Sequence, residues 1–476
     1  MNVPIGKQEN VVMLSRSLVL RRVTWMAVLA TAVVAPKMVF AQIGGGGGGI
    51  GGGGVVVDAA GVVRLKSSAD QSGRLTKEQQ AAARAGLNTK AAKRTTMRYV
   101  SLKHLEKAIR EKNGSITDEM RYLAGMLRVR YVFCYPDSGD IVIAGPAEGW
   151  TTDPAGRVIG ISSGRPVIRL DDLCVALRAF PPSGSATKFI GCSIDPTKEG
   201  LAAMQRFLHS IGAGADPRNP QRTQFIVEGL QSNLGLQTVT VNGVSAKTHF
   251  AVVMVEADYR MKLIGIGLEK PPVKLVSWVD RANAAQISRN ALARWFFTPD
   301  YQCVRTNSDG TAMELVGDGV KLIGEDEMVA ASGQRTDAGQ GNKASQAFVQ
   351  AFTKVYSELA DKSPVYAELR NLIDLSVMAA YLQQHDFYGK ANWKMEVLGD
   401  ENTIATETDN APKQVATAVN AIWKGHQLLT PVGGGVTINP LMALAPEKIL
   451  DDKDSKVSQA RDKVKIELAK GRWWWD

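Results

Sequence analysis

One segment, residues 365–384, constrains the fold more than any other part of the sequence, because its middle is apolar on nearly all sides. A helix at a protein surface carries an apolar stripe on one face, whereas a helix that is apolar all round must be covered on every side. Ser363 and Pro364 precede the segment and suit a helix cap followed by a first-turn proline. We therefore predict a helix at the centre of a core.

Asp374 places a carboxyl group inside this predicted helix, among apolar neighbours. Taking a carboxylate out of water without a partner is costly, so Asp374 needs a cation beside it. Arg370 lies four residues earlier on the same helix face and is the predicted partner. A catalytic role for Asp374 is the alternative, although most acids in such positions are structural.

Upstream of this helix, short alternating segments and turn-forming sequences predict hairpins. Residues 129–135 alternate in polarity, and the turn at 137–140 leads into the apolar run 141–144. Helical spacing is present at 197–211 and 221–234. Because hairpins dominate over long crossovers, we predict an α+β fold: a largely antiparallel sheet with packed helices, followed by a mostly helical C-terminal portion. Short strands at 393–398 and near 434–438 are predicted to return to a sheet.

Changes in composition divide the chain into parts, of which the most abrupt are a run of glycines after residue 43 and a polar, Gly-rich connector at 332–341. The predicted parts are a signal peptide at 1–41, a Gly-rich leash with a hairpin and a basic mobile segment at 42–96, an α+β core region at 97–331, a mainly helical region packed on that core at 342–445, and a charged helical tail at 446–476 that ends in three tryptophans.

The first 41 residues have the pattern of a cleavable secretory signal. Arg21 and Arg22 precede an apolar run at 23–35, and residues 39–41 suit a signal peptidase. An uncleaved membrane anchor is the alternative, but the run is shorter than the ~20 apolar residues that a membrane span needs. We therefore expect an exported protein of the periplasm, cell surface or extracellular space, without a transmembrane span after cleavage.

Positive charge is concentrated near the start of the predicted mature chain. Between residues 64 and 113, thirteen Lys or Arg stand against four Asp or Glu. Such an arm attracts a polyanionic surface, or it forms a solvated helix face. An envelope protein is a further possible partner, whereas nucleic acid is not expected for an exported chain without a basic-aromatic motif.

The cysteines and histidines give no indication of a metal or a cofactor. Cys134, Cys174, Cys192 and Cys303 are widely spaced, so they form either one or two disulfides or buried free thiols. The five histidines contain no H-x-x-x-H or H-E-x-x-H pattern. The G-x-S-x-G match at 160–164 precedes an extended segment rather than a helix, so it is predicted to be a loop. We expect neither a metal site nor a cofactor.

The strongest candidates for catalysis are Glu256, Asp258 and Arg260, which follow the apolar stretch 250–255 of a predicted strand at 250–256. A carboxylate pair does acid–base work when its surroundings separate the two pKa values. The alternative is that Asp258 caps a short helix while Arg260 and Lys262 pair with nearby acids.

Trp473, Trp474 and Trp475 are the candidates for binding. Tryptophan is common at protein interfaces and at membrane–water boundaries. These three side chains either dock to a partner or surface, or fold back onto their own domain.

Several segments together resemble the secreted proteins of planctomycete bacteria that carry a large domain of unknown function. The resemblance covers about residues 97–440 and implies export and one large unit, but it implies no activity, ligand or catalytic residue. The segments are MRYLAG (120–125), RVRYVFCYPDSGDIVIAGPAEGW (128–150), GRPVIRLDDLCVALRAF (164–180), VEADYRMKLIGIG (255–267), AMELVGDGVKL (312–322) and SPVYAELRNLIDL (363–375).

Two functions from different classes follow. The first is a non-catalytic binding or assembly protein of the periplasm or cell surface, and it rests on the leash, the basic arm and the tryptophans. The second is a carboxylate-dependent hydrolase acting on an envelope or extracellular polymer, and it requires a deep pocket that gathers acids and aromatic side chains.

Overall fold

The computed structural model describes residues 74–211, 219–282, 291–329, 343–420 and 433–464 without a break, with shorter stretches at 54–57, 62–66, 332–337, 423–428 and 466–476, some of them interrupted. The predicted leader and the glycine run lie outside the described residues. Residues 49–476 fall into one unit. Its helices pack with sheets whose strands are mostly antiparallel, which confirms the α+β class.

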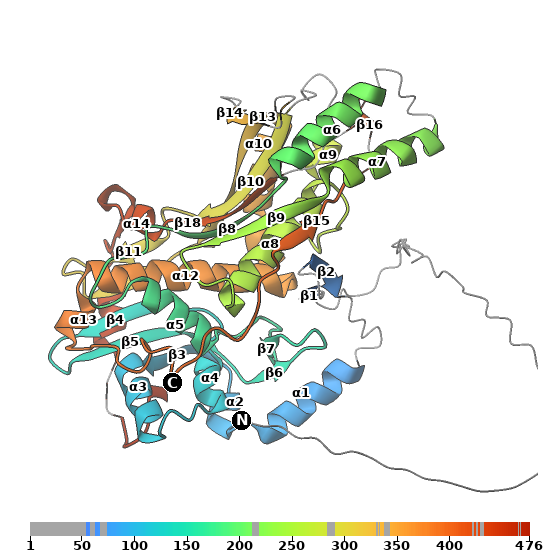
Figure 1. Cartoon of the computed structure of the whole chain (residues 1–476). Coiled ribbons are helices and arrows are strands. Elements are labelled where there is room, and N and C mark those ends of the chain that lie inside the picture. The colour runs from blue at the N-terminus through green and yellow to red at the C-terminus, as the bar shows by residue number, and fades with distance from the viewer. Residues whose placement is uncertain are drawn as a thin grey trace, which may run out of the picture. The chain divides into compact units, whose positions relative to one another are not determined.

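The larger of two main sheets combines strands that are far apart in the sequence (Figure 1). In spatial order its nine strands are β1 (Gly54–Val57), β2 (Val62–Lys66), β15 (Gln414–Ala416), β9 (Leu236–Asn242), β8 (Ile190–Asp195), β18 (Gly433–Ile438), β10 (Ala291–Pro299), β13 (Val320–Val329) and β14 (Arg335–Asp337). β18 pairs antiparallel with β8 and parallel with β10. The predicted hairpin before residue 67 is confirmed, because β1 and β2 pair antiparallel.

The second main sheet is built mostly from the predicted hairpin region. In spatial order its seven strands are β19 (Leu450–Asp451), β11 (Val304–Thr306), β12 (Ala312–Leu315), β4 (Tyr131–Tyr135), β5 (Asp140–Ala147), β3 (Thr95–Ser101) and β20 (Trp474–Trp475). β4 and β5 pair antiparallel across the predicted turn. Two further hairpins are formed by β6 (Trp150–Thr152) with β7 (Val158–Gly160) and by β16 (Trp423–Lys424) with β17 (Gln427–Leu428).

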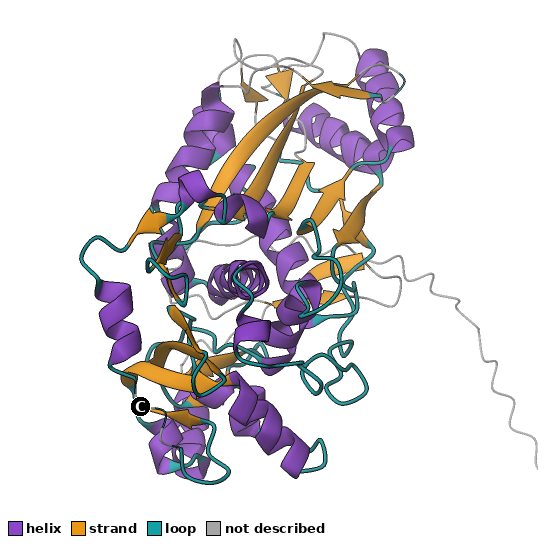
Figure 2. Ribbon diagram, turned by 90° about the vertical axis from the view of Figure 1, so that its left-hand side faces the viewer, coloured by secondary structure: helices purple, strands orange, loops and turns teal. Residues whose placement is uncertain are grey.

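The predicted central helix is confirmed as α12 (Pro364–Gln384), which lies between the two main sheets (Figures 1 and 2). Every residue from Val365 to Leu382 is buried. α12 packs against α5 (Leu170–Ala179), α8 (His249–Gly265), α11 (Tyr356–Lys362) and α14 (Pro440–Ala443). A helix covered by neighbours on all sides needs no polar face, which explains why the sequence of α12 is apolar nearly all round.

The prediction of a strand at 250–256 is wrong, because these residues form the first half of α8. A short apolar run does not distinguish a buried strand from a buried helix by its periodicity. The cap at Thr248 favours the helix, since its side chain accepts a hydrogen bond from Ala251 N at 3.2 Å. Of the helices described, none is long and apolar enough to cross a membrane.

The helices predicted at 197–211 and 221–234 are present as α6 (Lys198–Ile211) and α7 (Pro220–Leu234). The other described helices are α1 (Arg74–Gly86), α2 (Thr89–Ala92), α3 (Leu102–Glu111), α4 (Asp118–Arg121), α9 (Trp278–Arg281), α10 (Lys343–Lys354), α13 (Phe387–Lys390) and α15 (Lys456–Asp462). Helices dominate residues 343–390, whereas loops and short strands dominate 391–438. The predicted strand at 434–438 is present as β18, but the strand predicted at 393–398 is a loop.

Candidate functional site

The predicted catalytic group, Glu256, Asp258 and Arg260, lies on α8, with both carboxylates buried. Glu256 and Asp258 are two residues apart on a helix that turns about 100° per residue, so their side chains leave α8 in nearly opposite directions. The structure therefore does not bring these two carboxylates together.

Asp258 is fully buried beside Lys262. Lys262 Nζ donates to Asp258 Oδ2 at 2.8 Å and to the backbone oxygens of Ile194 at 2.9 Å and Gly434 at 3.2 Å. Burial raises the pKa of the Asp258 carboxyl to about 6, although the Lys262 ammonium opposes this shift. These contacts join α8 to β8 and β18, which gives the pair a structural role.

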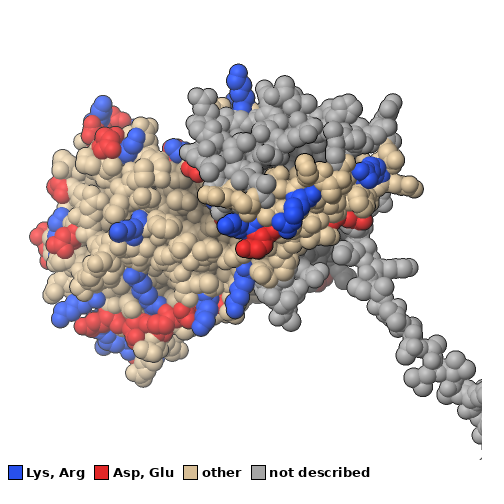
Figure 3. Space-filling model, turned by 45° about the horizontal axis from the view of Figure 1, so that its top comes forward, with Lys and Arg blue, Asp and Glu red and all other residues tan. Residues whose placement is uncertain are grey.

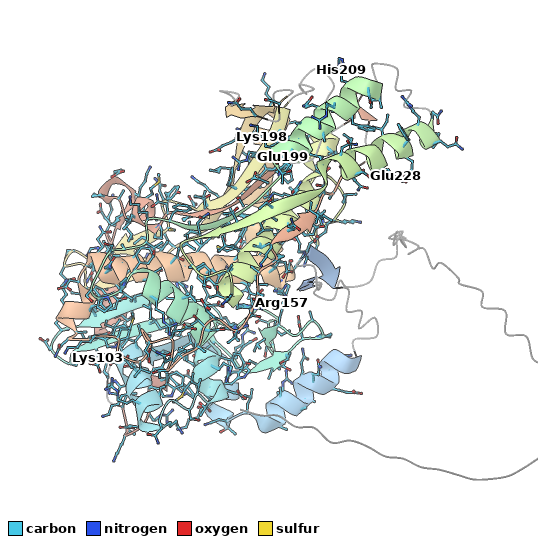
Figure 4. All side chains as sticks on the ribbon, viewed as in Figure 1. Lys103, Arg157, Lys198, Glu199, His209 and Glu228 are labelled. Atoms are coloured by element: carbon cyan, nitrogen blue, oxygen red, sulfur yellow. The ribbon has the colours of Figure 1, made fainter. Side chains whose placement is uncertain are left out.

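Glu256 takes part in a different ion-pair cluster. It accepts hydrogen bonds from Arg157 at 2.5 Å and from Arg260 at 3.4 Å. Arg157, labelled in Figure 4, also pairs with Glu368 on α12, while Arg260 pairs with Glu269 at 2.7 Å. Burial raises the pKa values of Glu368 and Glu269 in spite of the arginines. The cluster thus joins α8 to α12 and to the loop between β6 and β7.

The predicted pairing of Asp374 with Arg370 is replaced by a contact with another segment. Asp374 accepts hydrogen bonds from Arg128 at 2.6 Å and 3.3 Å. Helical spacing puts Arg370 within range, but it does not reveal that Arg128, from the segment before β4, reaches the same carboxylate. Asp374 is therefore part of the ionic contact between α12 and the segment that leads into β4.

A cavity of about 400 Å³ opens between α3 and residues 392–396. Sequence reasoning missed it because its two walls are nearly 300 residues apart. Its lining includes four cationic side chains: Lys103, Lys107, Arg110 and Lys394. Residues 103, 107 and 110 lie on one face of α3, because residues three and four apart are neighbours on a helix. The stretch 64–113, in which Lys and Arg outnumber Asp and Glu, thus supplies three of these cations.

The second wall of this cavity is shaped by a buried carboxylate, Glu106, which is 5% exposed. Glu106 accepts hydrogen bonds from Trp393 Nε1 and Val397 N, and from Leu398 N at 3.1 Å. The same wall contains Asn392 and Met395 in the left-handed region, at φ values of 45° and 55°. A methionine in this conformation is uncommon, and the contacts to Glu106 hold the loop that imposes it.

His104 also lines the cavity, next to a buried acid. Its Nδ1 atom lies 2.9 Å from Ser101 Oγ and 3.3 Å from Asp140 Oδ2. Ser101 caps α3 and donates to Asp140 Oδ1 at 2.7 Å. Burial raises the pKa of Asp140, while the Ser101 hydrogen bond opposes the shift. These contacts hold the His104 ring against the N-terminus of α3.

The three tryptophans fold back onto their own chain. Trp473 and Trp474 are 4% and 5% exposed, and Trp475 is partly exposed. Trp474 and Trp475 form β20, which pairs antiparallel with β3. Trp475 stacks on Tyr99 with ring centroids 5.5 Å apart. No local pattern indicates this pairing, since Trp474 and its partner Val100 lie 374 residues apart in the sequence.

All four cysteines are free and buried. Burial raises the pKa of Cys134 to about 11 and those of Cys174 and Cys303 to about 12, so these thiols are poor nucleophiles. The sequence left open whether the cysteines form disulfides or buried free thiols, and in the structure they are buried free thiols. Across the described residues, no three His, Cys, Asp or Glu side chains gather as a metal ion would require.

Comparison with known proteins adds one similarity. A family model described as a protein of unknown function (DUF1598) matches residues 192–278. This stretch runs from β8 through α6, α7, β9 and α8 to the first residue of α9. Neither the curated proteins nor the solved structures give a match. Residues 192–278 are therefore similar to a domain of unknown function.

Proposed function

We propose that this chain is an exported, non-catalytic protein that binds an anionic polymer of the envelope or extracellular space. The observation that carries the proposal is the cationic cavity between α3 and residues 392–396. We infer export from the predicted leader. Outside the cytosol, a basic surface attracts the anionic polymers of the envelope, and these are therefore the proposed ligand class.

The charges of the cavity are unbalanced in favour of cations. Its lining holds four Lys or Arg against two carboxylates, Glu106 and Glu396. Glu106 is occupied by the hydrogen bonds that shape the loop, and Glu396 pairs with Arg110 at 2.9 Å. Lys103 and Lys394 pair with no carboxylate in the described part of the chain, so their charges remain available to a ligand.

Part of this arrangement is fixed before any ligand arrives. Lys103 Nζ donates to the backbone oxygens of Ala391 at 2.6 Å and Asn392 at 3.4 Å, which fixes the ammonium against the second wall. A pre-positioned cation loses less conformational entropy on binding an anion than a free one does. On the face shown in Figure 3, some Lys and Arg side chains stand beside Asp or Glu and others stand apart from them.

The geometry gives the hydrolase less support. Glu256 and Asp258 are directed to opposite sides of α8, and each is neutralised by its own cation. The cationic cavity instead contains no pair of free carboxylates, because Glu106 and Glu396 are both engaged. Acid–base hydrolysis by two carboxyl groups requires such a pair.

The test compares binding of polyphosphate, poly-L-glutamate and neutral dextran to the wild type and to two double variants. Lys107→Gln with Lys394→Gln removes two cavity cations, while Lys188→Gln with Lys198→Gln is the charge-matched control at exposed positions. Lys103 and Lys198 lie far apart in Figure 4. We expect the cavity variant to bind the polyanions about tenfold more weakly, and the control to match the wild type.

Binding should also weaken as salt is added, because solvent-exposed charges are screened. The two polyanions distinguish a preference for phosphate from one for carboxylate. Equal loss of binding in both double variants would show that only the overall positive charge matters, and it would overturn the assignment to this cavity.

A further inference from the structure

The residues 473–476 occupy a groove along the edge of β3. Trp474 lies opposite Val100 in the strand pairing, and Trp475 lies opposite Tyr99. Ser101 N donates to the backbone oxygen of Trp473 at 2.9 Å. An edge strand offers unpaired backbone groups, and this short segment covers them.

The centre of the groove is Arg98, whose side chain is completely buried. Its Nε and Nη2 atoms donate to the Asp476 carboxylate at 2.6 Å and 3.1 Å, a bidentate contact. The indole of Trp474 covers the guanidinium at 4.6 Å from the ring centroid. The remaining hydrogen bonds of Arg98 go to the backbone oxygens of Lys90, Ala91, Lys93 and Ala124.

The groove is therefore built for an acidic residue that follows an aromatic strand. Asp476 is the carboxylate that Arg98 contacts, and a buried cation without an anion is strongly unfavourable. Beside the groove lies a cavity of about 440 Å³, lined in part by Lys90, Lys93 and Trp475. This space leaves the segment accessible from one side.

The contacts that hold residues 473–476 come from residues 90–101 and 124, far away in the sequence. Towards α15 the chain continues through a connector, residues 463–472, whose described residues belong to no helix or strand. A turn at Ala469–Arg472 includes Gly471 at φ 77°. The groove thus recognises the segment itself and does not require that the segment belong to the same chain.

We propose that this groove is a peptide-binding site that takes residues 473–476 from a second copy of the chain, which gives a strand-exchanged dimer. The exchanged copy makes the same contacts with Arg98, Tyr99 and Ser101 as the tethered segment does. The two arrangements therefore differ mainly in the path of the connector and in the concentration at which the groove meets the segment.

A tethered segment has an effective concentration of ~1 mM. The wild type therefore exchanges its segment between copies only as the chain concentration approaches this value, whereas a shortened tether allows exchange at much lower concentration. Deleting Lys470 and Gly471 removes two residues of the connector and leaves residues 473–476 and the residues that bind them, 90–101 and 124, unchanged in sequence. We expect this shortened variant to be a dimer by light scattering at concentrations at which the wild type is a monomer.

The matched control is the shortened variant that also carries Trp474→Ala and Asp476→Ala, which should be a monomer because its segment no longer fits. A second measurement uses a labelled peptide of residues 468–476 and the full-length chain with Trp474→Ala and Asp476→Ala. The peptide should bind this chain with saturation, and at least tenfold more tightly than it binds the wild type, whose groove is filled.

Circular dichroism and thermal unfolding establish that each variant is folded before binding is measured. A folded double variant that fails to bind the peptide overturns the proposal. A shortened variant that stays monomeric also overturns it, because the groove of one copy would then fail to bind the segment of another. A dimer that persists after Trp474→Ala and Asp476→Ala places the contact elsewhere and overturns it as well.

Discussion

α8 and α3 both carry several charged residues within two or three turns, yet the two sets have opposite surroundings. On α8, the side chains of Glu256, Asp258 and Lys262 are at most 5% exposed, and each has a partner of opposite charge. On α3, Lys107 and Arg110 are 66% and 56% exposed and line a cavity. Charged clusters of similar spacing thus join core elements in one helix and line a cavity in the other.

The amphipathic pattern explains this difference. α3 places Leu102, Leu105 and Ile109 on one face, so its Lys and Arg side chains lie on the solvent side, and only the carboxylate of Glu106 is buried. α8 is apolar nearly throughout and packs against both α12 and the nine-stranded sheet, so its charges have no solvent side. A charged residue on an all-round apolar helix is therefore better interpreted as a structural ion pair than as a catalytic group.

The largest effect should come from Arg157→Met. It leaves Glu256 and Glu368 buried and close together without their shared cation. We expect the free energy of unfolding in urea to fall by about 3–5 kcal/mol. Lys107→Met on α3 is the control and should change it by less than about 0.5 kcal/mol. Equal losses in the two variants would remove the contrast between α8 and α3.

Asp476→Ala is an intermediate case, because Asp476 is partly exposed while its partner Arg98 is fully buried. Arg98 then loses two charge-assisted hydrogen bonds, so unfolding should become easier by about 1–3 kcal/mol. Asp462→Ala is the control, since Asp462 is 69% exposed and its contact to Arg461 is 3.4 Å long. A negligible loss for Asp476→Ala, measured by urea unfolding, would contradict the role assigned to this pair.

Because the pKa of Asp258 is raised to about 6, the contribution of this residue on α8 to stability depends on pH. In the unfolded chain an aspartate has a pKa of about 3.9, so between about pH 4 and pH 6 the folded state holds a proton that the unfolded state has released. This contribution to stability is present at about pH 4 and is lost as the pH rises through about 6.

Asp258→Asn cannot titrate, so it isolates this contribution. The stability of the wild type relative to Asp258→Asn should decrease by about 1–2 kcal/mol between pH 4 and pH 6, as urea unfolding at several pH values would measure. The Lys107→Met variant keeps Asp258 and should follow the wild type across this window. A relative stability that rises with pH would show that Asp258 is ionised in the folded core throughout.

The smallest change in stability should come from Glu396→Gln, because Glu396 is 61% exposed. Unfolding should shift by less than about 0.5 kcal/mol, whereas polyphosphate binding should become about twofold to threefold tighter, since the cavity loses a negative charge. Glu358→Gln removes a similarly exposed acid that pairs with Lys362 and should leave binding unchanged. Weaker binding by Glu396→Gln would mean that this acid contributes to the ligand contact.

The parts of the fold that follow from local pattern were predictable. The apolar middle of α12 indicated a helix at the centre of the core, and the alternation at 129–135 with its turn indicated β4 and β5. Both signals are periodicities within one segment, which a sequence displays directly. The first turns of α8 have no such periodicity, so a buried helix was taken for a buried strand.

The contacts between distant segments could not be predicted. Arg128 reaches Asp374 across 246 residues, and Arg98 reaches Asp476 across 378. Similarly, the cationic cavity exists only because a loop near residue 394 lies over α3. Spacing along the chain reports on neighbours within a helix or a hairpin, whereas these partners are set by the tertiary packing.

The position of β18 has a consequence for the order in which the protein is completed. β18 is contributed by residues 433–438, yet it fills the gap between β8, at 190–195, and β10, at 291–299. As the ribosome delivers the chain, the nine-stranded sheet stays in separate parts until β15 and then β18 have emerged. The stretch 192–278 made alone would lack this strand and expose the edge of β8, so we expect it not to fold independently.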